Sequence, residues 1–133
     1  MNIIYEGDLR SATFGSAGNK VLVTDGSKTH GGKEEYLSPL DAVAAVLVSC
    51  MMTVMGIAAK RHDLDLGGMS AVVEKEMMEK PEYRIRKISA VFAMPKGMDA
   101  TARRILENTA HACPVHKCLN PEIQVQLVFN YDD

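Results

Sequence analysis

The residues most able to do chemistry are three cysteines, Cys50, Cys113 and Cys118. Cys50 lies within a long apolar stretch, where a free thiol is typically a buried core residue. Cys113 is followed directly by Pro114, which is favoured at the first position of a helix, so Cys113 is a candidate N-cap. Peptide N–H groups at a helix N-terminus stabilise a thiolate. Cys113 is therefore either a reactive thiol or an incidental one at a tight junction between two helices.

The segment from His111 to Cys118 holds two histidines and two cysteines, residue types that also bind zinc. Structural zinc sites draw ligand pairs from separated segments, whereas these four residues lie within eight consecutive positions that Pro114 stiffens. Cys113 and Cys118 are five positions apart, which on a helix turns them about 140° from each other and disfavours a bond between them. The chain also has no nucleotide-binding glycine loop, zinc-protease motif or serine-hydrolase motif. We expect no metal and no other cofactor.

The composition favours one globular domain, residues 1–133, in a reducing compartment. Hydrophobic residues make up 47% and charged residues 24% of the 133 residues, as in ordinary soluble domains. The net charge is −2, which gives no basic surface for nucleic acid. An odd number of cysteines argues against a secreted disulfide scaffold, and the first residues lack the basic start of a signal peptide. We therefore expect a cytoplasmic protein.

The most unusual predicted element is a central helix. Ser38 is a candidate N-cap and Pro39 suits the first helical position. The eighteen residues from 42 to 59 carry no charge. This length reaches the lower limit for a membrane span, but the alanine content and the polar Ser, Thr and Gly residues disfavour one. We predict instead a helix that is apolar all round because a sheet or a partner subunit buries it on all sides.

The rest of the pattern predicts strands around this helix and a second helix that Asp99 begins. The strand from Ile85 alternates, so that Ile85 would share a side with Val91, and Arg86 a side with Ile88. Strands, a buried helix, strands, a helix and a final strand predict a single α+β domain. The strands are expected at Asn2–Phe14, Lys20–Thr24, Met69–Met78, Ile85–Met94 and Ile123–Tyr131, and the second helix at Ala100–Ala112.

Two segments together resemble the OsmC/Ohr superfamily, which includes osmotically inducible proteins and organic hydroperoxide resistance proteins. Ser38-Pro39-Leu40-Asp41, followed nine residues later by Cys50, is similar to the family's Ser-Pro-x-Glu-Leu…Cys segment. The segment from His111 to His116 resembles the second signature, in which Cys-Pro-Val opens the last short helix. The order of elements agrees along essentially the whole chain.

This resemblance implies an α+β fold in which antiparallel sheets wrap around the long buried central helices of an intertwined homodimer. It also implies a thiol-dependent peroxidase that reduces organic hydroperoxides during oxidative or osmotic stress. Cys50 would be the peroxidatic thiolate and become a sulfenic acid, and Cys113 would resolve it as a disulfide. An external thiol or dithiol would then reduce the disulfide. The resemblance gives Cys118 no role in this cycle.

The groups that would hold the Cys50 thiolate depart from the family pattern, which pairs an Arg with a Glu. The Glu corresponds to Asp41, one methylene shorter, and an unbroken helix would turn Asp41 about 180° from Cys50. No motif places the Arg. Arg10 is the first candidate, with Arg84 and Arg86 as rivals.

Two other functions stay open. A stress-associated binding protein would carry the cysteines in an apolar cleft at the dimer interface without turnover. An acyl-thioester-handling enzyme would also suit a buried helix wrapped by a sheet, although no carboxylate or Ser/His pair supports it. For the peroxidase we expect an apolar pocket lined by Met51 and Met52.

Overall fold

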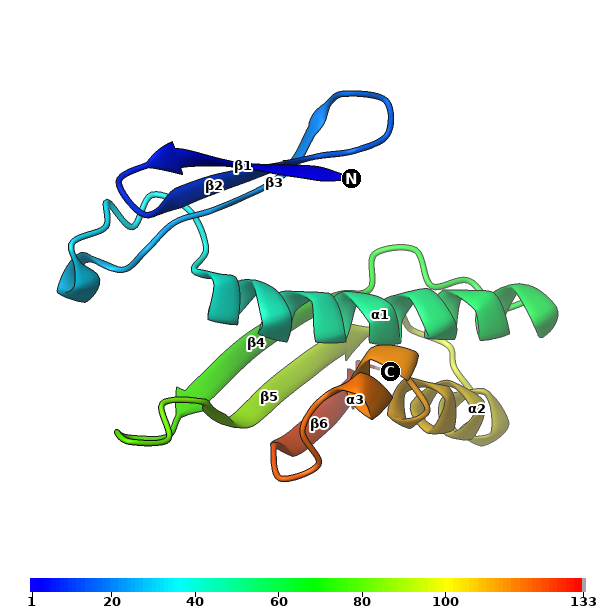
Figure 1. The fold of residues 1–133 in the computed structure, drawn as a ribbon. Helices are drawn as coiled ribbons and strands as arrows, with labels where there is room; N and C mark the ends of the chain where they lie inside the picture. The colour runs from blue at the N-terminus through cyan, green and yellow to red at the C-terminus, as the bar shows by residue number, and fades with distance from the viewer. Residues whose placement is uncertain (133) are drawn as a thin grey trace. The chain divides into compact units, whose positions relative to one another are not determined.

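The structure, a computed structural model, describes residues 1–132. The chain divides into two compact units, Met1–Val43 and the remainder from Ala44 onward. Each unit contains its own three-stranded sheet, and the long helix α1 begins in the first unit and continues through the second (Figure 1). The expectation of a single domain over residues 1–133 stays a prediction.

The first unit is an antiparallel sheet in the order β1-β2-β3, followed by a short 3-10 turn. Ala12 in the central strand is fully buried, whereas Ile3, Ile4 and Leu22 remain exposed. Because a small sheet with exposed apolar residues is marginally stable in water, this unit needs a further surface to cover it. The elements are β1 (Asn2–Gly7), β2 (Arg10–Phe14), β3 (Lys20–Thr24) and the turn Lys28–His30.

Helix α1 (Pro39–Arg61) starts where the sequence predicts and runs without a break. The Ser38 hydroxyl accepts a hydrogen bond from the Asp41 amide at 3.0 Å, and the Ser38 amide donates to the Asp41 carboxylate at 3.3 Å. This reciprocal pair is a capping box with Asp in the place usually held by Glu. Two basic residues in the last turn complement the negative end of the helix dipole.

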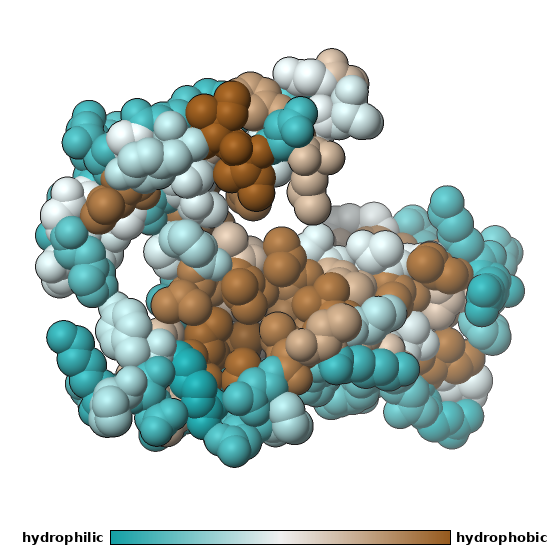
Figure 2. Space-filling model, in the orientation of Figure 1, coloured by the Kyte–Doolittle hydropathy of each residue, from teal (hydrophilic) through white to brown (hydrophobic). Residues whose placement is uncertain are grey.

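One face of α1 forms much of the core of the second unit. Leu47, Met51 and Met55 have no exposed surface, whereas Val46 and Ile57 are 48% and 49% exposed. Hydrophobic side chains gather along this helix in Figure 2. The helix is long and apolar enough to cross a membrane, a test that the core helix of a soluble protein also passes. Within one chain, the prediction of burial on all sides therefore holds for one face only.

The sheet of the second unit has the order β4-β5-β6. β4 pairs with β5 antiparallel, but β5 pairs with β6 parallel. Two helices, α2 and α3, connect β5 to β6 and supply the crossover that a parallel pairing needs. This sheet is therefore mixed rather than wholly antiparallel. The elements are β4 (Ser70–Met77), β5 (Ile85–Met94), α2 (Ala100–His111), α3 (Pro114–Cys118) and β6 (Gln124–Tyr131).

The start of β5 corrects the predicted alternation of side chains. Met77 pairs with Ile85 and Glu76 with Lys87, so Arg86 is the extra residue of a β-bulge. The bulge shifts the alternation by one position: Ile85 is buried with Ile88, and Arg86 is exposed. The remaining strand keeps the predicted period.

Candidate functional site

Cys113 lies at the junction between α2 and α3, as the N-cap of α3. This confirms the position predicted from Pro114. The Cys113 side chain is fully buried, and its Sγ donates a weak hydrogen bond to the Leu47 carbonyl oxygen in α1 at 3.9 Å. The buried thiol is therefore held against the central helix.

Cys50 lies three residues after Leu47 in α1 and is half-buried. Its thiol neighbours the Cys113 thiol closely enough to influence the pKa of that group. Both side chains are free thiols, as is Cys118, which is exposed at the end of α3. The structure thus brings Cys50 and Cys113 together and leaves Cys118 in solvent. Within residues 1–132, no group of three or more His, Cys, Asp or Glu side chains is arranged to hold a metal ion.

The environment of Cys113 raises the pKa of its thiol above the ordinary value of 9.0. Burial is the largest cause, and the neighbouring Cys50 thiol acts in the same direction. The amides of His116 and Val115 act in the opposite direction but do not outweigh burial. Burial therefore outweighs the helix N-terminus, and the raised pKa favours the protonated thiol of Cys113 at neutral pH. Whether Cys113 is reactive or incidental stays a prediction.

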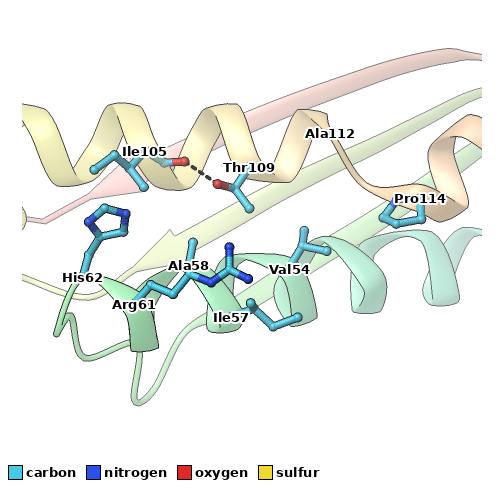
Figure 3. Close-up of a pocket in the computed structure, with 9 residues that line it drawn as sticks. All are labelled: Val54, Ile57, Ala58, Arg61, His62, Ile105, Thr109, Ala112 and Pro114. Carbon is cyan, nitrogen blue, oxygen red and sulfur yellow. Dashed lines mark hydrogen bonds between the residues drawn. The ribbon is translucent and has the colours of Figure 1, made fainter.

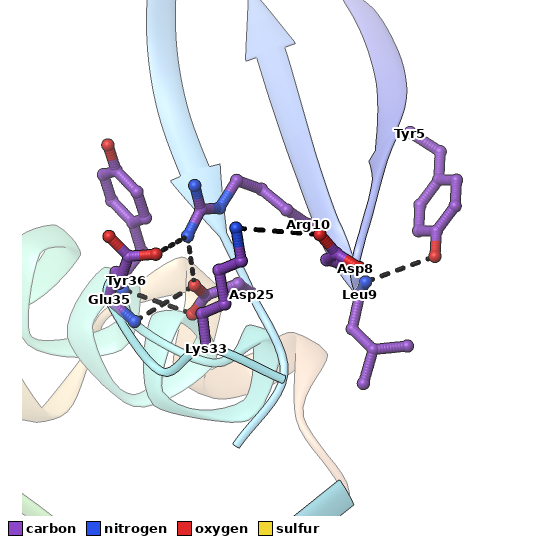
Figure 4. A network of polar contacts seen from close by, with 8 residues as sticks. All are labelled: Tyr5, Asp8, Leu9, Arg10, Asp25, Lys33, Glu35 and Tyr36. Carbon is purple, nitrogen blue, oxygen red and sulfur yellow. Dashed lines mark hydrogen bonds and ion pairs between the residues drawn. The ribbon is translucent and has the colours of Figure 1, made fainter. Parts of the chain in front are cut away.

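Arg10 lies at the start of β2 and its guanidinium is held by two carboxylates (Figure 4). Its Nη2 donates to Asp25 and to Glu35, both at 2.9 Å, and its Cζ lies 4.8 Å from the centre of the Tyr36 ring. Neither Asp25 nor Glu35 is among the site residues that the sequence predicts. No local signal marks these partners, because they are distant along the chain.

The two rival arginines are engaged in ion pairs of the second unit. Arg84 pairs with Glu122, and the exposed Arg86 pairs with Glu76 at 3.3 Å. All three candidate arginines are therefore held by carboxylates, and Arg84 Nη1, like Arg10 Nε, is buried without a hydrogen-bond partner among the described residues. Asp41, in turn, has an observed role in the capping box of α1.

A groove of about 340 Å³ lies between α1 and α2 (Figure 3). Its walls are mostly apolar, and Arg61 and His62 supply basic groups at the end of α1. Ala112 and Pro114, which flank Cys113, also line the groove. The complete lining is Val54, Ile57, Ala58, Arg61, His62, Ile105, Thr109, Ala112 and Pro114. Met51 is fully buried in the core, and neither Met51 nor Met52 lines this groove, so the expected pocket at these two residues stays a prediction.

Two neighbouring thiols, one in a long central helix and one at the N-cap of a short helix, define a dithiol site in an α+β protein. The model of the OsmC-like protein family matches residues 31–128. The chain belongs to the OsmC family.

Solved structures agree with this assignment. A protein from Psychrobacter arcticus 273-4, with a proposed role in osmotic stress and detoxification, is 32% identical, with a TM-score of 0.91, over 97% of this chain and 93% of that one. An OsmC-like protein from Mycoplasma pneumoniae is 14% identical, with a TM-score of 0.81, over 99% and 95%. The organic hydroperoxide resistance protein OhrB of Bacillus subtilis is 18% identical, with a TM-score of 0.69, over 97% and 96%. No match is found among curated proteins.

The predicted α+β OsmC-like fold and the resemblance to the OsmC/Ohr superfamily are therefore confirmed, whereas the intertwined dimer stays a prediction. The two more distant structures support the fold alone. Osmotic stress, detoxification and hydroperoxide resistance, the roles given to these relatives, all belong to stress defence.

Proposed function

We propose that this protein is a thiol-dependent peroxidase that reduces organic hydroperoxides in stress defence. The observation that carries the proposal is that the Cys50 and Cys113 thiols are neighbours: Cys113 bonds to Leu47, less than one helical turn before Cys50, and Cys50 influences the pKa of Cys113. A disulfide requires two sulfur atoms about 2.05 Å apart, so it needs two thiols that are neighbours in the fold. Family membership supports the same chemistry.

The reaction has three steps. The Cys50 thiolate attacks the terminal oxygen of the hydroperoxide, the O–O bond breaks, and the alcohol leaves after taking a proton. The sulfur is oxidised to a sulfenic acid. The Cys113 thiol then attacks this sulfur: the S–S bond forms, the S–O bond breaks, and the hydroxyl leaves as water with the Cys113 proton. Two external thiols, or one dithiol, reduce the disulfide and are themselves oxidised to a disulfide.

The accessibility of the two thiols favours a division of roles. Cys113 has no exposed surface, whereas Cys50 is partly exposed, so both the hydroperoxide and the external reductant would reach Cys50 first. The raised pKa of Cys113 fits the resolving role if the thiol gives its proton to the departing hydroxyl as its sulfur attacks Cys50, since the attacking sulfur must lose that proton. A disulfide that must be reduced in every cycle is useful only in a reducing compartment, which supports a soluble, cytoplasmic protein.

The family pattern supports the peroxidatic thiolate with an Arg and a Glu. We keep Asp41, which stands at the position of the Glu, and Arg10, our candidate for the Arg, as proposed site residues. Arg10 has N–H groups beyond those bound to Asp25 and Glu35, so it is able to hold a further acceptor. Asp41 also caps α1, so its substitution is expected to affect stability as well as activity.

We further propose that the protein acts as a homodimer. Val46 and Ile57 leave an apolar stripe exposed on α1, and β1 and β3 leave apolar side chains exposed on the small sheet. Contiguous exposed apolar surface of this kind typically marks an interface. A second copy of the chain would cover it, as the family resemblance implies.

The groove between α1 and α2 favours a second candidate, a binding protein without turnover. Its apolar walls and volume of about 340 Å³ suit a small apolar ligand. Such a protein would bind the ligand regardless of the redox state of its cysteines. The peroxidase, by contrast, must change its thiols when it meets a hydroperoxide.

The deciding experiment measures consumption of tert-butyl hydroperoxide with dithiothreitol as reductant. The wild-type protein is expected to consume the hydroperoxide. The Cys50→Ser variant is expected to lose this activity, and the Cys113→Ser variant is expected to lose most of it. Cys118→Ser is the matched control, because this thiol is exposed and away from the pair, and it is expected to retain activity. Equal consumption by the wild-type and Cys50→Ser proteins would leave the binding protein as the better candidate.

A further inference from the structure

Asp25, directly after β3, is the one charged side chain that is buried among residues 1–132, with 1% of its surface exposed. Its Oδ2 accepts hydrogen bonds from Arg10 Nη2 at 2.9 Å and from the Glu35 amide at 3.1 Å. Its Oδ1 accepts one from the Tyr36 amide at 3.2 Å (Figure 4). The hydrogen bond from Arg10 is the largest cause that lowers the pKa of Asp25, so this buried carboxylate is ionised at neutral pH.

The contacts of Arg10 leave part of its guanidinium unused. Both carboxylates bind the same nitrogen, Nη2, while the other terminal nitrogen points away from them in Figure 4. The Nε atom is buried and has no hydrogen-bond partner in the described part of the chain. An unpaired buried donor is costly, which indicates that Arg10 is arranged to receive an acceptor that these contacts do not supply.

The two carboxylates that hold Arg10 differ in their surroundings. Asp25 is buried and anchored by two backbone amides as well as by Arg10. The Glu35 side chain is 58% exposed, and an exposed ion pair of this kind is weak because water screens it. Asp25 is therefore the fixed partner and Glu35 the exchangeable one, although both lie 2.9 Å from the same nitrogen.

We infer that Asp25 is a positioning residue for the reaction, which fixes the Arg10 guanidinium so that its free N–H groups hold an anionic sulfur or oxygen. Because it concerns Arg10 in peroxide reduction, this inference rests on the proposed function. Asp25 itself touches neither substrate nor thiolate in this role. It acts through Arg10, and Glu35 contributes little.

The test is a double-mutant cycle in the full chain, with Asp25→Asn, Arg10→Ala and the two combined, and with Glu35→Gln as the matched comparison. Turnover of tert-butyl hydroperoxide gives kcat and KM, and labelling of Cys50 by iodoacetamide across pH gives a readout that needs no turnover. Asp25→Asn is expected to lower kcat/KM by about tenfold or more, as for loss of a hydrogen bond to a charged group. It is also expected to shift the Cys50 labelling profile to higher pH, and Glu35→Gln is expected to have a smaller effect on both.

In the Arg10→Ala background, Asp25→Asn is expected to cause no further loss. The inference is overturned if Asp25→Asn lowers kcat/KM by the same factor with and without Arg10. It is also overturned if Asp25→Asn and Glu35→Gln have equal effects. Should Asp25→Asn not fold, as judged by circular dichroism, Asp25→Glu takes its place, because it keeps the charge but moves it by one methylene. A folded Asp25→Glu protein with full turnover then contradicts the inference and one with reduced turnover supports it. Turnover that does not depend on Cys50 contradicts the proposed function instead, and the labelling profiles still decide the role of Asp25.

Discussion

The Cys113 thiol donates to the Leu47 carbonyl oxygen across 66 positions of sequence. Leu47 precedes Cys50 by less than one helical turn, so this contact joins the N-cap of α3 to the part of α1 that carries Cys50. The two thiols therefore meet because α3 packs against α1. Neither the apolar helix nor the Cys-Pro segment would bring them together alone.

The first prediction concerns the oxidised protein. One equivalent of tert-butyl hydroperoxide is expected to remove two hydrogens from the intact mass, and peptide mapping is expected to find a Cys50–Cys113 disulfide, because these thiols are neighbours. Cys118→Ser is expected to behave like the wild type. The Cys113→Ser variant is expected to carry added oxygen on Cys50 instead, which increases its intact mass. A disulfide that involves Cys118 in the wild-type protein would contradict the assignment of the pair.

The second prediction concerns the reduced thiols. Burial and the neighbouring Cys50 raise the pKa of Cys113 above 9.0, so Cys113 carries little thiolate at pH 8. Labelling by iodoacetamide is expected to be at least about tenfold slower at Cys113 than at the exposed Cys118, since only an accessible thiolate reacts. Mass spectrometry of the two peptides gives both rates from one sample. In urea, where burial is lost, the rates are expected to converge; a difference that persists there has another cause.

The elements that sequence reasoning placed correctly are those with a local signal. Asp99 caps α2 through the amide of Ala102, and Ser38 caps α1 in the same way through the amide of Asp41. In each case the hydrogen bond joins two residues that are three positions apart, so the residue types and their spacing are enough to predict it. Pro114 marks the start of α3 for the same reason.

The features that sequence reasoning missed depend on distant parts of the chain. Arg10 meets Asp25 and Glu35 across 15 and 25 positions, and nothing near Arg10 marks these partners. The bulge at Arg86 and the parallel pairing of β6 follow from strand register and from the crossover through two helices. The pKa of Cys113 was open for a related reason: the helix N-terminus is visible in the sequence, but the burial that outweighs it is not.

The third prediction concerns the start of α1. Ser38→Ala and Asp41→Ala each remove one half of the capping box, so each is expected to lower the free energy of unfolding by about 1 kcal/mol. Urea denaturation followed by circular dichroism measures both. Peroxide turnover separates the two roles of Asp41: if it also supports the thiolate, Asp41→Ala loses more activity than the equally destabilised Ser38→Ala. Equal activity of the two variants would remove Asp41 from the proposed site.

The fourth prediction is a pH dependence of stability that comes from Asp25. Arg10 and the two backbone amides hold the pKa of Asp25 below its ordinary value of 3.8. A depressed carboxyl pKa stabilises the folded state above the unfolded-state pKa, and this contribution is lost as the pH falls below about 4 through the folded-state pKa. Wild type is therefore expected to be more stable than Asp25→Asn at pH 7, with the difference shrinking as the pH falls below 4. Thermal unfolding of both proteins at several pH values measures it, and a difference independent of pH would assign the stabilisation to packing rather than to charge.

The last prediction concerns the apolar stripe on α1. Val46 and Ile57 are eleven residues apart, which is close to three full helical turns, so their exposed side chains lie on one face about 16 Å apart along the axis. If a second copy of the chain covers this face, Ile57→Asp buries an unpaired charge in the interface and is expected to convert dimer to monomer in sedimentation experiments. Val72→Asp is the matched control, because Val72 is 67% exposed but lies on β4, away from the stripe. It is expected to leave the dimer intact, and a wild-type protein that sediments as a monomer at micromolar concentration would contradict the proposed assembly.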